Sequence, residues 1–553
     1  MKLQLGESYH GFRLLESSTV DEINSIARIF YHEKSGARLL HLENDDDNKV
    51  FSITFRTPPA DSTGVPHIVE HSVLCGSRKF PLKEPFVELI KGSLNTFLNA
   101  MTFPDKTMYP IASRNEKDFR NLMNVYLDAV FYPRMLNSPE ILMQEGWHYE
   151  LEDKDSEITY KGVVYNEMKG VFSAPDAILE RKTLEFLFPD TTYGVESGGD
   201  PEYIPDLTQE QFAAFHRRYY HPANSYIFLY GDLHLLDNLK FLDEAYLQEY
   251  DKRPAGSEIA VQPPFAKPVE QVIEYAVSST EKVEDKTFLS MNVVVGQVTE
   301  PENYLGFQIL EHMLLETPAA PLKKALLAAG IGKDVFGSFD KSLLQPVFTI
   351  GVSGANQGQQ KKFKETVEQT LRKLVKDGID KKIIEASVNL YEFALREANY
   401  GQRPKGLVYN IKCMDSWLYD ENPLIHLRYE ATLEKIKTSL TTPYFENLIK
   451  EYLLDNPHQV LVVLKPCPGL AEEKSSQIQQ KLAAFKAQLS PKKITALVEE
   501  TRKLKAMQAA SDSAEALTKI PLLDIKDIEP QAEYLSIVEK EENGSKVLFH
   551  PYF

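Results

Sequence analysis

Cysteine is scarce in this chain of 553 residues, which holds three: Cys75, Cys413 and Cys467. They lie far apart in the sequence, so a reducing compartment fits them better than a disulfide framework. Basic residues are outnumbered, because 62 Lys and Arg stand against 80 Asp and Glu, for a formal net charge of −18. That charge keeps a protein soluble and argues against nucleic acid or an anionic membrane as its main partner.

Long apolar runs and targeting signals are also missing. No stretch approaches the roughly 18 consecutive apolar residues that a membrane-spanning helix needs. The first residues, MKLQLGESYHGF, lack the apolar core of a signal peptide and the Arg/Ser bias of a transit peptide. We therefore expect a soluble cytoplasmic protein, long enough for several globular domains.

The N-terminal part has the pattern of a sheet. Residues 25–33, 38–44 and 49–57 read as three strands joined by turn-forming residues. Phe51, Ile53 and Phe55 alternate with polar residues in the third segment, which predicts a strand buried on one face only. Long helical patterns follow, and then a further apolar strand, SYIFLYGD, from Ser225.

The chain also contains a candidate internal repeat. The segment that starts at Leu207 resembles the one that starts at Leu440, and both predict a helix, a Pro-containing turn and a strand. The matching apolar positions are Phe212, Phe215 and Tyr219 in the first copy, and Phe445, Leu448 and Tyr452 in the second. Because many helix–turn–strand units share this pattern, the match by itself leaves coincidence open. A Pro/Gly-containing stretch between the copies, residues 251–268, is typical of a domain boundary.

The last part of the chain differs in composition. Two helical patterns interrupted by LSPKK, from Leu489, predict an antiparallel helical hairpin. A β-hairpin is expected near the C-terminus, where a new domain would start and be truncated. The predicted organisation is a catalytic zinc-binding α+β domain (1–252), a degenerate non-catalytic α+β repeat (268–466), a helical-hairpin linker (467–530) and the start of a third domain (531–553).

The stretch GVPHIVEHSVLCG, Gly64 to Gly76, carries the chemistry. On a helix His67 and His71 lie one turn apart on one face, and two neutral imidazoles in that arrangement can reach one zinc ion. Glu70 beside them is placed to take a proton from water. The alternative is that both histidines are satisfied core residues and the glutamate is on the surface. Cys75 could also coordinate, but a catalytic zinc keeps one position open.

Two longer segments carry a family resemblance. PHIVEHSVLCGSRKFPLKEPFVELIKGSLNTFLNAMTFPDKTMYPIAS, from Pro66, and YKGVVYNEMKG, from Tyr160, resemble the pitrilysin/insulinase family of inverted-motif (HxxEH) zinc peptidases, and within it the presequence-protease and falcilysin-like members. The resemblance covers essentially the whole chain. It implies an α+β fold of two homologous α/β-roll domains, with helices packed on mostly antiparallel sheets, followed by a helical-hairpin linker.

The resemblance also implies a site. One Zn²⁺ would be held by His67, His71 and Glu167, with Glu70 as the general base. Some relatives carry a further glutamate at the position of Tyr160, and that role is not transferred. Asn99 and Ala100 match an edge strand that binds peptide backbone.

A trace of the degenerate second domain is visible as well. The segment QILEH, Gln308 to His312, mimics HIVEH but has glutamine in place of the first ligand, so His312 is interpreted as structural.

The function that follows is a zinc metalloendopeptidase that degrades oligopeptides and short unfolded segments. Relatives in this family have two halves that close around a chamber, and this chain resembles the N-terminal half. We therefore expect its partners to be peptide substrates and a C-terminal half, in the same chain or in trans. Two alternatives remain: a peptide-binding half that cannot cleave without its partner, and a structural subunit of a processing complex, which an intact zinc motif disfavours.

Overall fold

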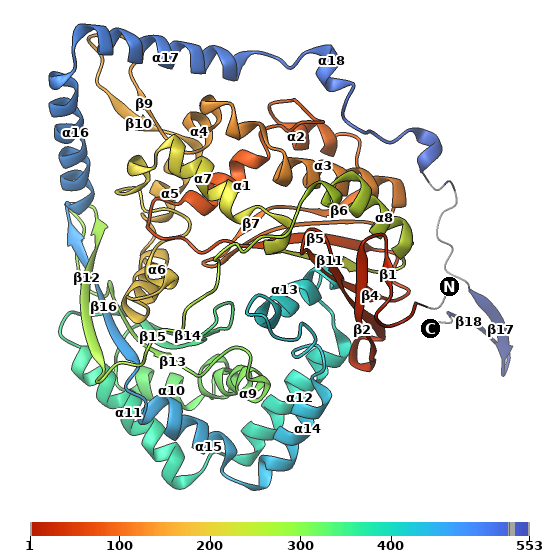
Figure 1. The fold of residues 1–553 in the computed structure, drawn as a ribbon. Helices are drawn as coiled ribbons and strands as arrows, with labels where there is room; N and C mark the ends of the chain where they lie inside the picture. The colour runs from red at the N-terminus through yellow and green to blue at the C-terminus, as the bar shows by residue number, and fades with distance from the viewer. Residues whose placement is uncertain (1–2, 529, 531–536, 551–553) are drawn as a thin grey trace.

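Two β-sheets organise the protein in the computed structural model, which describes residues 3–528, 530 and 537–550 (Figure 1). The first sheet contains β1 Ser8–Tyr9, β2 Phe12–Val20, β3 Ser25–His32, β4 Arg38–Glu43, β5 Lys49–Arg56, β6 Asn95–Leu98, β7 Met101–Thr102, β8 Lys106–Ser113 and β11 Ser225–Tyr230. The second contains β12 Val269–Val277, β13 Thr287–Val294, β14 Asp334–Asp340, β15 Val347–Ala355 and β16 Gln459–Pro468.

The two sheets share one strand order. The first runs β4-β11-β5-β8-β6 and the second runs β12-β16-β13-β15-β14, so the last strand of each set lies between the first two. In each sheet that strand is parallel to one neighbour and antiparallel to the other. The predicted helix–turn–strand units are present at both places and end in β11 and β16. The predicted α+β class, with mostly antiparallel sheets and helices packed on them, is confirmed.

Helices follow the strands in corresponding places, since α1 follows β5 and α9 follows β13. The helices of the first repeat are α1 Val65–Val73, α2 Pro85–Ile90, α3 Glu116–Phe131, α4 Pro139–Glu145, α5 Val163–Val171, α6 Pro175–Leu187, α7 Gln209–Tyr219 and α8 Leu235–Ala245. Those of the second are α9 Pro301–Glu311, α10 Pro321–Ala328, α11 Gln360–Asp377, α12 Lys381–Glu397, α13 Lys405–Trp417, α14 Glu430–Thr438 and α15 Tyr444–Leu448.

The prediction of one-sided burial for β5 is wrong, because every residue of this strand is buried. One face packs on the core of the first repeat, and the other lies under α13, which belongs to the second repeat (Figure 1). Contact is close enough that a Cβ on Gly406 would lie 2.4 Å from the Tyr230 ring. The polar residues of β5 are therefore covered by a helix that starts about 350 residues later in the chain, and a local pattern cannot show this.

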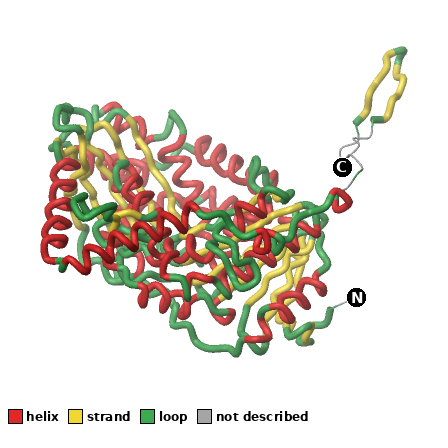
Figure 2. The backbone as a smooth tube through the Cα atoms, turned by 90° about the horizontal axis from the view of Figure 1, so that it is seen from above, coloured by secondary structure: helices red, strands yellow, loops and turns green. Residues whose placement is uncertain are grey.

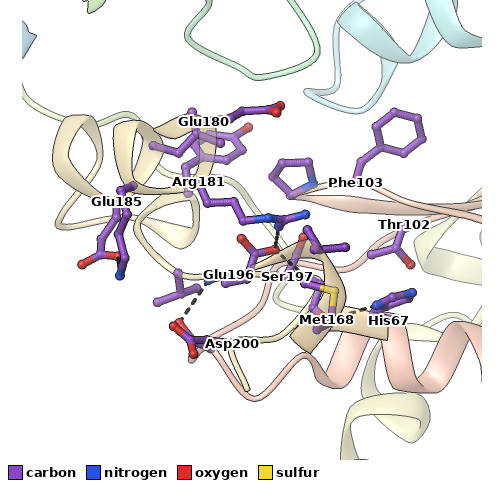
Figure 3. Close-up of a pocket in the computed structure, with 18 of the residues that line it drawn as sticks. His67, Thr102, Phe103, Met168, Glu180, Arg181, Glu185, Glu196, Ser197 and Asp200 are labelled. Carbon is purple, nitrogen blue, oxygen red and sulfur yellow. Dashed lines mark hydrogen bonds and ion pairs between the residues drawn. The ribbon is translucent and has the colours of Figure 1, made fainter. Parts of the chain in front are cut away.

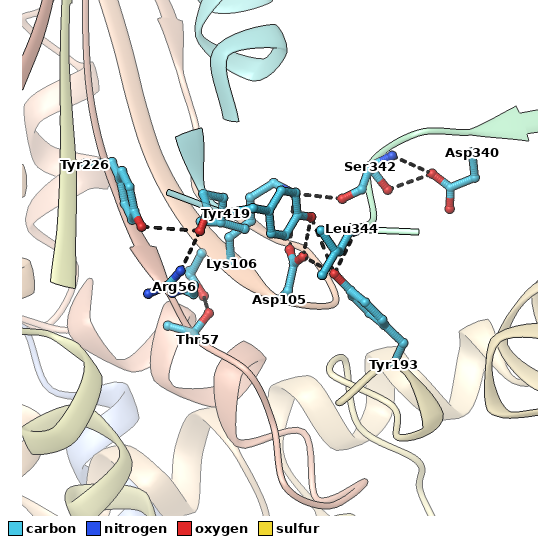
Figure 4. Close-up of polar contacts among 12 residues, drawn as sticks. Arg56, Thr57, Asp105, Lys106, Tyr193, Tyr226, Asp340, Ser342, Leu344 and Tyr419 are labelled. Carbon is cyan, nitrogen blue, oxygen red and sulfur yellow. Dashed lines mark hydrogen bonds and ion pairs between the residues drawn. The ribbon is translucent and has the colours of Figure 1, made fainter. Parts of the chain in front are cut away.

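A buried polar network also joins the repeats (Figure 4). The Asp105 carboxylate is fully buried and accepts hydrogen bonds from Tyr193 Oη at 2.6 Å and from Tyr419 Oη at 2.7 Å. Lys106 Nζ lies 3.2 Å from Asp105 Oδ1 and donates to the Ser342 carbonyl at 3.0 Å. Tyr419 and Ser342 belong to the second repeat, so a charged pair of the first repeat is satisfied by groups from the second.

The linker contains the two expected helices, α16 Leu470–Gln488 and α17 Pro491–Ala509, but not the antiparallel arrangement. Leu489 and Ser490 have extended backbone, with ψ of 137° and 153°, and α17 leaves α16 at an open angle (Figure 1). Both helices pack on the hairpin of β9 His148–Glu150 and β10 Thr159–Lys161, where Phe485 stacks on Tyr149 at 4.7 Å. They cover this hairpin instead of each other.

Beyond α18 Ala514–Leu517, the chain leads to the hairpin of β17 Val538–Glu542 and β18 Ser545–Phe549, which projects away from the body (Figure 2). The predicted β-hairpin is thus present, while residues 531–536 and 551–553 of that predicted segment lie outside the described residues. Within the described part of the chain, none of the helices has the length and apolarity to span a bilayer.

Candidate metal centre

The helix α1 presents the HxxEH residues, and its local sequence explains why. Pro66 suits the first turn, and Gly64 ahead of it has φ of +70°, a conformation that glycine adopts at low cost. Ile68, Val69 and Val73 are fully buried and fix one face of the helix in the core, as predicted. His67 and His71 consequently share the other face, with ring centroids 4.9 Å apart.

Glu167 on α5 completes a group of three side chains with metal-ligand chemistry. Its Oε2 atom lies 3.8 Å from His67 Nε2 and 3.8 Å from His71 Nε2. The three ligand atoms all lie within 4.8 Å of one another, which matches a tetrahedral zinc with bonds of about 2.0–2.2 Å. Among the described residues, this is the single cluster of three or more potential ligands that has this geometry.

The other ring nitrogens have partners of their own. His67 Nδ1 lies 3.0 Å from the Gly198 carbonyl, and His71 Nδ1 lies 3.3 Å from Glu145 Oε2 on α4. A carbonyl or carboxylate on Nδ1 places the proton there and leaves Nε2 free to bind a metal. Burial lowers the pKa of the His71 imidazole, but Glu145, Glu70 and Glu167 outweigh it, so the pKa is raised.

Cys75 does not face this group. Its thiol lies 3.5 Å from Glu145 Oε1, and burial together with that carboxylate raises its pKa well above the ordinary value. A protonated thiol is a poor metal ligand. Tyr160 on β10 packs against Trp147 and Tyr149 and offers no carboxylate.

Glu70 lies on the same face of α1 and is nearly buried. Its Oε2 atom accepts a hydrogen bond from Thr102 Oγ1 at 2.8 Å, which ties the carboxylate to the edge of the first sheet. It also lines a cavity of about 630 Å³ together with His67 and Glu167 (Figure 3). The cavity continues past Phe103 and Met168 to Asp340 and Ser342 of the second repeat, so both repeats contribute to its walls.

Asn99 and Ala100 lie between β6 and β7, at the open edge of the first sheet. The register against β8 is continuous, since Leu98 pairs with Ile111 and Met101 with Met108. Asn99 N–H donates to the Pro110 carbonyl at 3.3 Å, but Pro110 has no N–H to return. Tyr126 Oη donates to the Asn99 carbonyl instead, at 3.1 Å. Ala100 is the next residue, so its N–H and C=O point away from β8 toward the open edge.

The corresponding place in the second repeat is occupied differently. Gln308 lies on α9, and its side-chain oxygen accepts a hydrogen bond from the Lys341 ammonium. His312 Nδ1 lies 2.8 Å from Ser387 Oγ. The predicted structural role of His312 is consistent with that contact and stays a prediction.

Sequence reasoning missed Glu145, Thr102 and the segment around Gly198. A lone glutamate or threonine gives no signal in a single sequence. The Gly198–Gly199 pair does signal close backbone approach, since a Cβ on Gly64 would lie 2.6 Å from Gly199 Cα.

Two family models match the chain. The model described as peptidase M16 inactive domain matches residues 206–391, and a second model, for the region associated with subfamily C of the M16 peptidases, matches residues 464–553. His67, His71 and Glu167 lie outside both stretches. With the fold and the curated relatives, these matches place the chain in the M16 peptidases, the pitrilysin/insulinase family to which it belongs.

Two curated relatives and one solved structure illustrate the similarity. The chain is 50% identical over 552 residues to protein HypA of Clostridium perfringens, covering 100% of this chain and 57% of that protein. It is 43% identical over 551 residues to presequence protease 1, chloroplastic/mitochondrial, of Arabidopsis thaliana, covering 98% of this chain and 51% of that protein. The chain thus spans about half the length of these relatives. A protease from Helicobacter pylori aligns with TM-score 0.63 and 14% identity, over 82% of this chain and 99% of that one, and supports the fold alone.

Proposed function

We propose that this chain carries the metal site of a zinc-dependent endopeptidase that cleaves oligopeptides and short unfolded segments. The observation that supports this most is the convergence of His67 Nε2, His71 Nε2 and Glu167 Oε2 beside a buried glutamate. Two imidazoles and one carboxylate are a donor set typical of catalytic zinc, and the three leave a coordination position open. The residues present therefore fit this metal.

Each side chain of the site has a separate task. Zinc, when bound, would polarise a peptide carbonyl and lower the pKa of water. Glu70 is the base that takes the proton, and Thr102 holds its carboxylate in place. Glu145 orients the His71 ring through Nδ1.

The open edge at Ala100 is the proposed place for the substrate backbone. A peptide that pairs with this edge would use the outward N–H and C=O of Ala100, so binding would depend little on side chains. Such an edge requires an extended peptide, and this favours unfolded segments over folded proteins.

A second candidate is favoured by the length comparison. Because the chain spans about half of its curated relatives, the full activity can require a C-terminal half, in the same chain or in trans. In that case the chain binds zinc and peptide but turns over slowly. Groups that stabilise the oxyanion typically contribute about 10²–10³ in rate each, and a second half would supply them.

The experiment measures zinc content and cleavage of a fluorogenic peptide, with and without an added C-terminal half. We expect about one zinc per chain, weak cleavage alone, and faster cleavage with the second half. His71→Ala should lose the metal, because two remaining ligands rarely retain it. Full zinc occupancy in that variant would refute the ligand assignment. Cleavage by the chain alone, unchanged when the second half is added, would show that the half is dispensable.

A further inference from the structure

The two histidines of the site are oriented by different means. His71 Nδ1 faces the carboxylate of Glu145, whereas His67 Nδ1 faces a neutral backbone carbonyl, that of Gly198. A carbonyl orients a ring only as well as its own segment is held. The segment Glu196–Asp200 therefore determines how firmly His67 is aimed at Glu167.

This segment is pressed against the start of α1. Glu196 N–H donates to Ser62 Oγ at 3.1 Å, and Asp200 N–H donates to the Ser62 carbonyl at 2.9 Å. Gly64 and Gly199 both have positive φ, and no Cβ fits at either, since each backbone lies against the other. The backbone contacts fix the two ends of the segment, and Gly198 lies between them.

An ion pair holds the middle. Glu196 Oε1 accepts a hydrogen bond from Gly198 N–H at 2.8 Å and pairs with the Arg181 guanidinium, which comes from α6 (Figure 3). The Glu196 side chain is 15% exposed and that of Arg181 29%. Both line the same cavity as His67, so the pair is shielded more than a surface ion pair.

We infer that Arg181 and Glu196 are positioning residues for His67: their ion pair holds the Gly198 peptide so that its carbonyl keeps the His67 ring aimed at the metal. This inference rests on the proposed function, because it assigns the pair a task toward the zinc. The contacts run in one direction, from Arg181 to Glu196, then to Gly198 N–H, and through the Gly198 carbonyl to His67 Nδ1. Neither Arg181 nor Glu196 contacts the metal position, and neither is a catalytic residue.

The test measures the zinc dissociation constant of the whole chain by competition with a chromophoric chelator. Glu196→Ala removes both the acceptor for Gly198 N–H and the partner of Arg181. We expect zinc to bind about 10–100-fold more weakly, the usual cost of removing an outer partner of a ligating histidine. Arg181→Met should weaken binding less, because Glu196 still accepts from Gly198, and Arg181→Lys should restore part of the affinity.

Lys182→Met is the matched control, since Lys182 is the neighbouring cation on α6 and pairs with Glu185 instead, at 2.6 Å. Its zinc affinity should equal that of the unaltered chain. Cobalt substitution adds a second readout: the visible absorption of Co²⁺ reports ligand geometry, and it should change in Glu196→Ala and not in Lys182→Met.

Circular dichroism of the metal-free variants identifies any chain that fails to fold, and Arg181→Met then carries the test. Zinc affinity within twofold of the unaltered chain in folded Glu196→Ala and Arg181→Met would overturn the inference while leaving the proposed function intact. Absence of zinc binding in the unaltered chain would overturn the proposed function, and the inference with it.

Discussion

Replacing Asp105 by asparagine should destabilise both repeats together. The substitution keeps the shape of the side chain but removes the charge that Lys106 faces, and Lys106 is only 1% exposed. Removing one partner of a buried pair costs about 3–5 kcal/mol, because the other charge stays buried without compensation. Here the Ser342 carbonyl and the Phe103 ring, 4.7 Å from Nζ, remain to Lys106, so the lower part of that range applies.

The chain offers a separate fluorescent probe for each repeat. Its two tryptophans are Trp147, beside the β9–β10 hairpin of the first repeat, and Trp417, at the end of α13 against Tyr226. Urea unfolding of the Trp147→Phe and Trp417→Phe chains then follows one repeat at a time. If the network couples the repeats, both probes report the same transition, and Asp105→Asn lowers both midpoints.

Two further variants sharpen the measurement. Lys106→Met combined with Asp105→Asn removes both charges and should recover part of the lost stability. Asp377→Asn, which breaks the exposed pair with Lys373, is the control and should leave both transitions in place. A loss below about 1 kcal/mol in Asp105→Asn would refute the reasoning, because it is less than a buried charge can cost. So would a shift confined to Trp147.

The remaining predictions concern the site. Glu70→Gln should keep zinc while peptide turnover, measured with the C-terminal half present, falls by about 10²–10⁴-fold; full turnover would exclude Glu70 as the base. Glu145→Gln should weaken zinc binding by about 10–100-fold in the chelator assay, since an amide orients the His71 ring less well than a carboxylate, and unchanged affinity would contradict that role. Ala100→Pro should leave the fold intact, because proline is tolerated where the N–H faces outward from an edge, but should weaken peptide binding in a fluorescence anisotropy titration. Equal affinity would show that peptides do not pair with this edge.

Local patterns predicted the elements that a single segment determines. The α1 helix, the strands β3, β4 and β5 and the two linker helices all follow from periodicity and turn residues. The path from α7 to β11 was predicted in the same way. His67 and His71 were predicted to share a helix face because four residues separate them, and that much needs no knowledge of the rest of the chain.

The rest depends on contacts between distant segments. Nothing in residues 49–56 indicates that α13 covers their polar face, and nothing near Leu489 indicates that β9 and β10 separate the linker helices. Glu167 was chosen through family resemblance, because the sequence contains many acidic residues of similar local pattern. Glu145 has no local signature, so its contact with His71 became visible only in three dimensions.

The Gln308–Lys341 contact determines what it would take to engineer a second metal site into this chain. Restoring histidine at 308 would place the new imidazole against a buried ammonium, and two positive charges would then compete for one small space. Lys341 would have to be replaced first, and its neighbours Asp415, Glu311 and Asp340, whose negative charges it faces, would then need another cation. A metal could be that cation. A minimal design therefore starts with the removal of a charge and adds ligands afterwards.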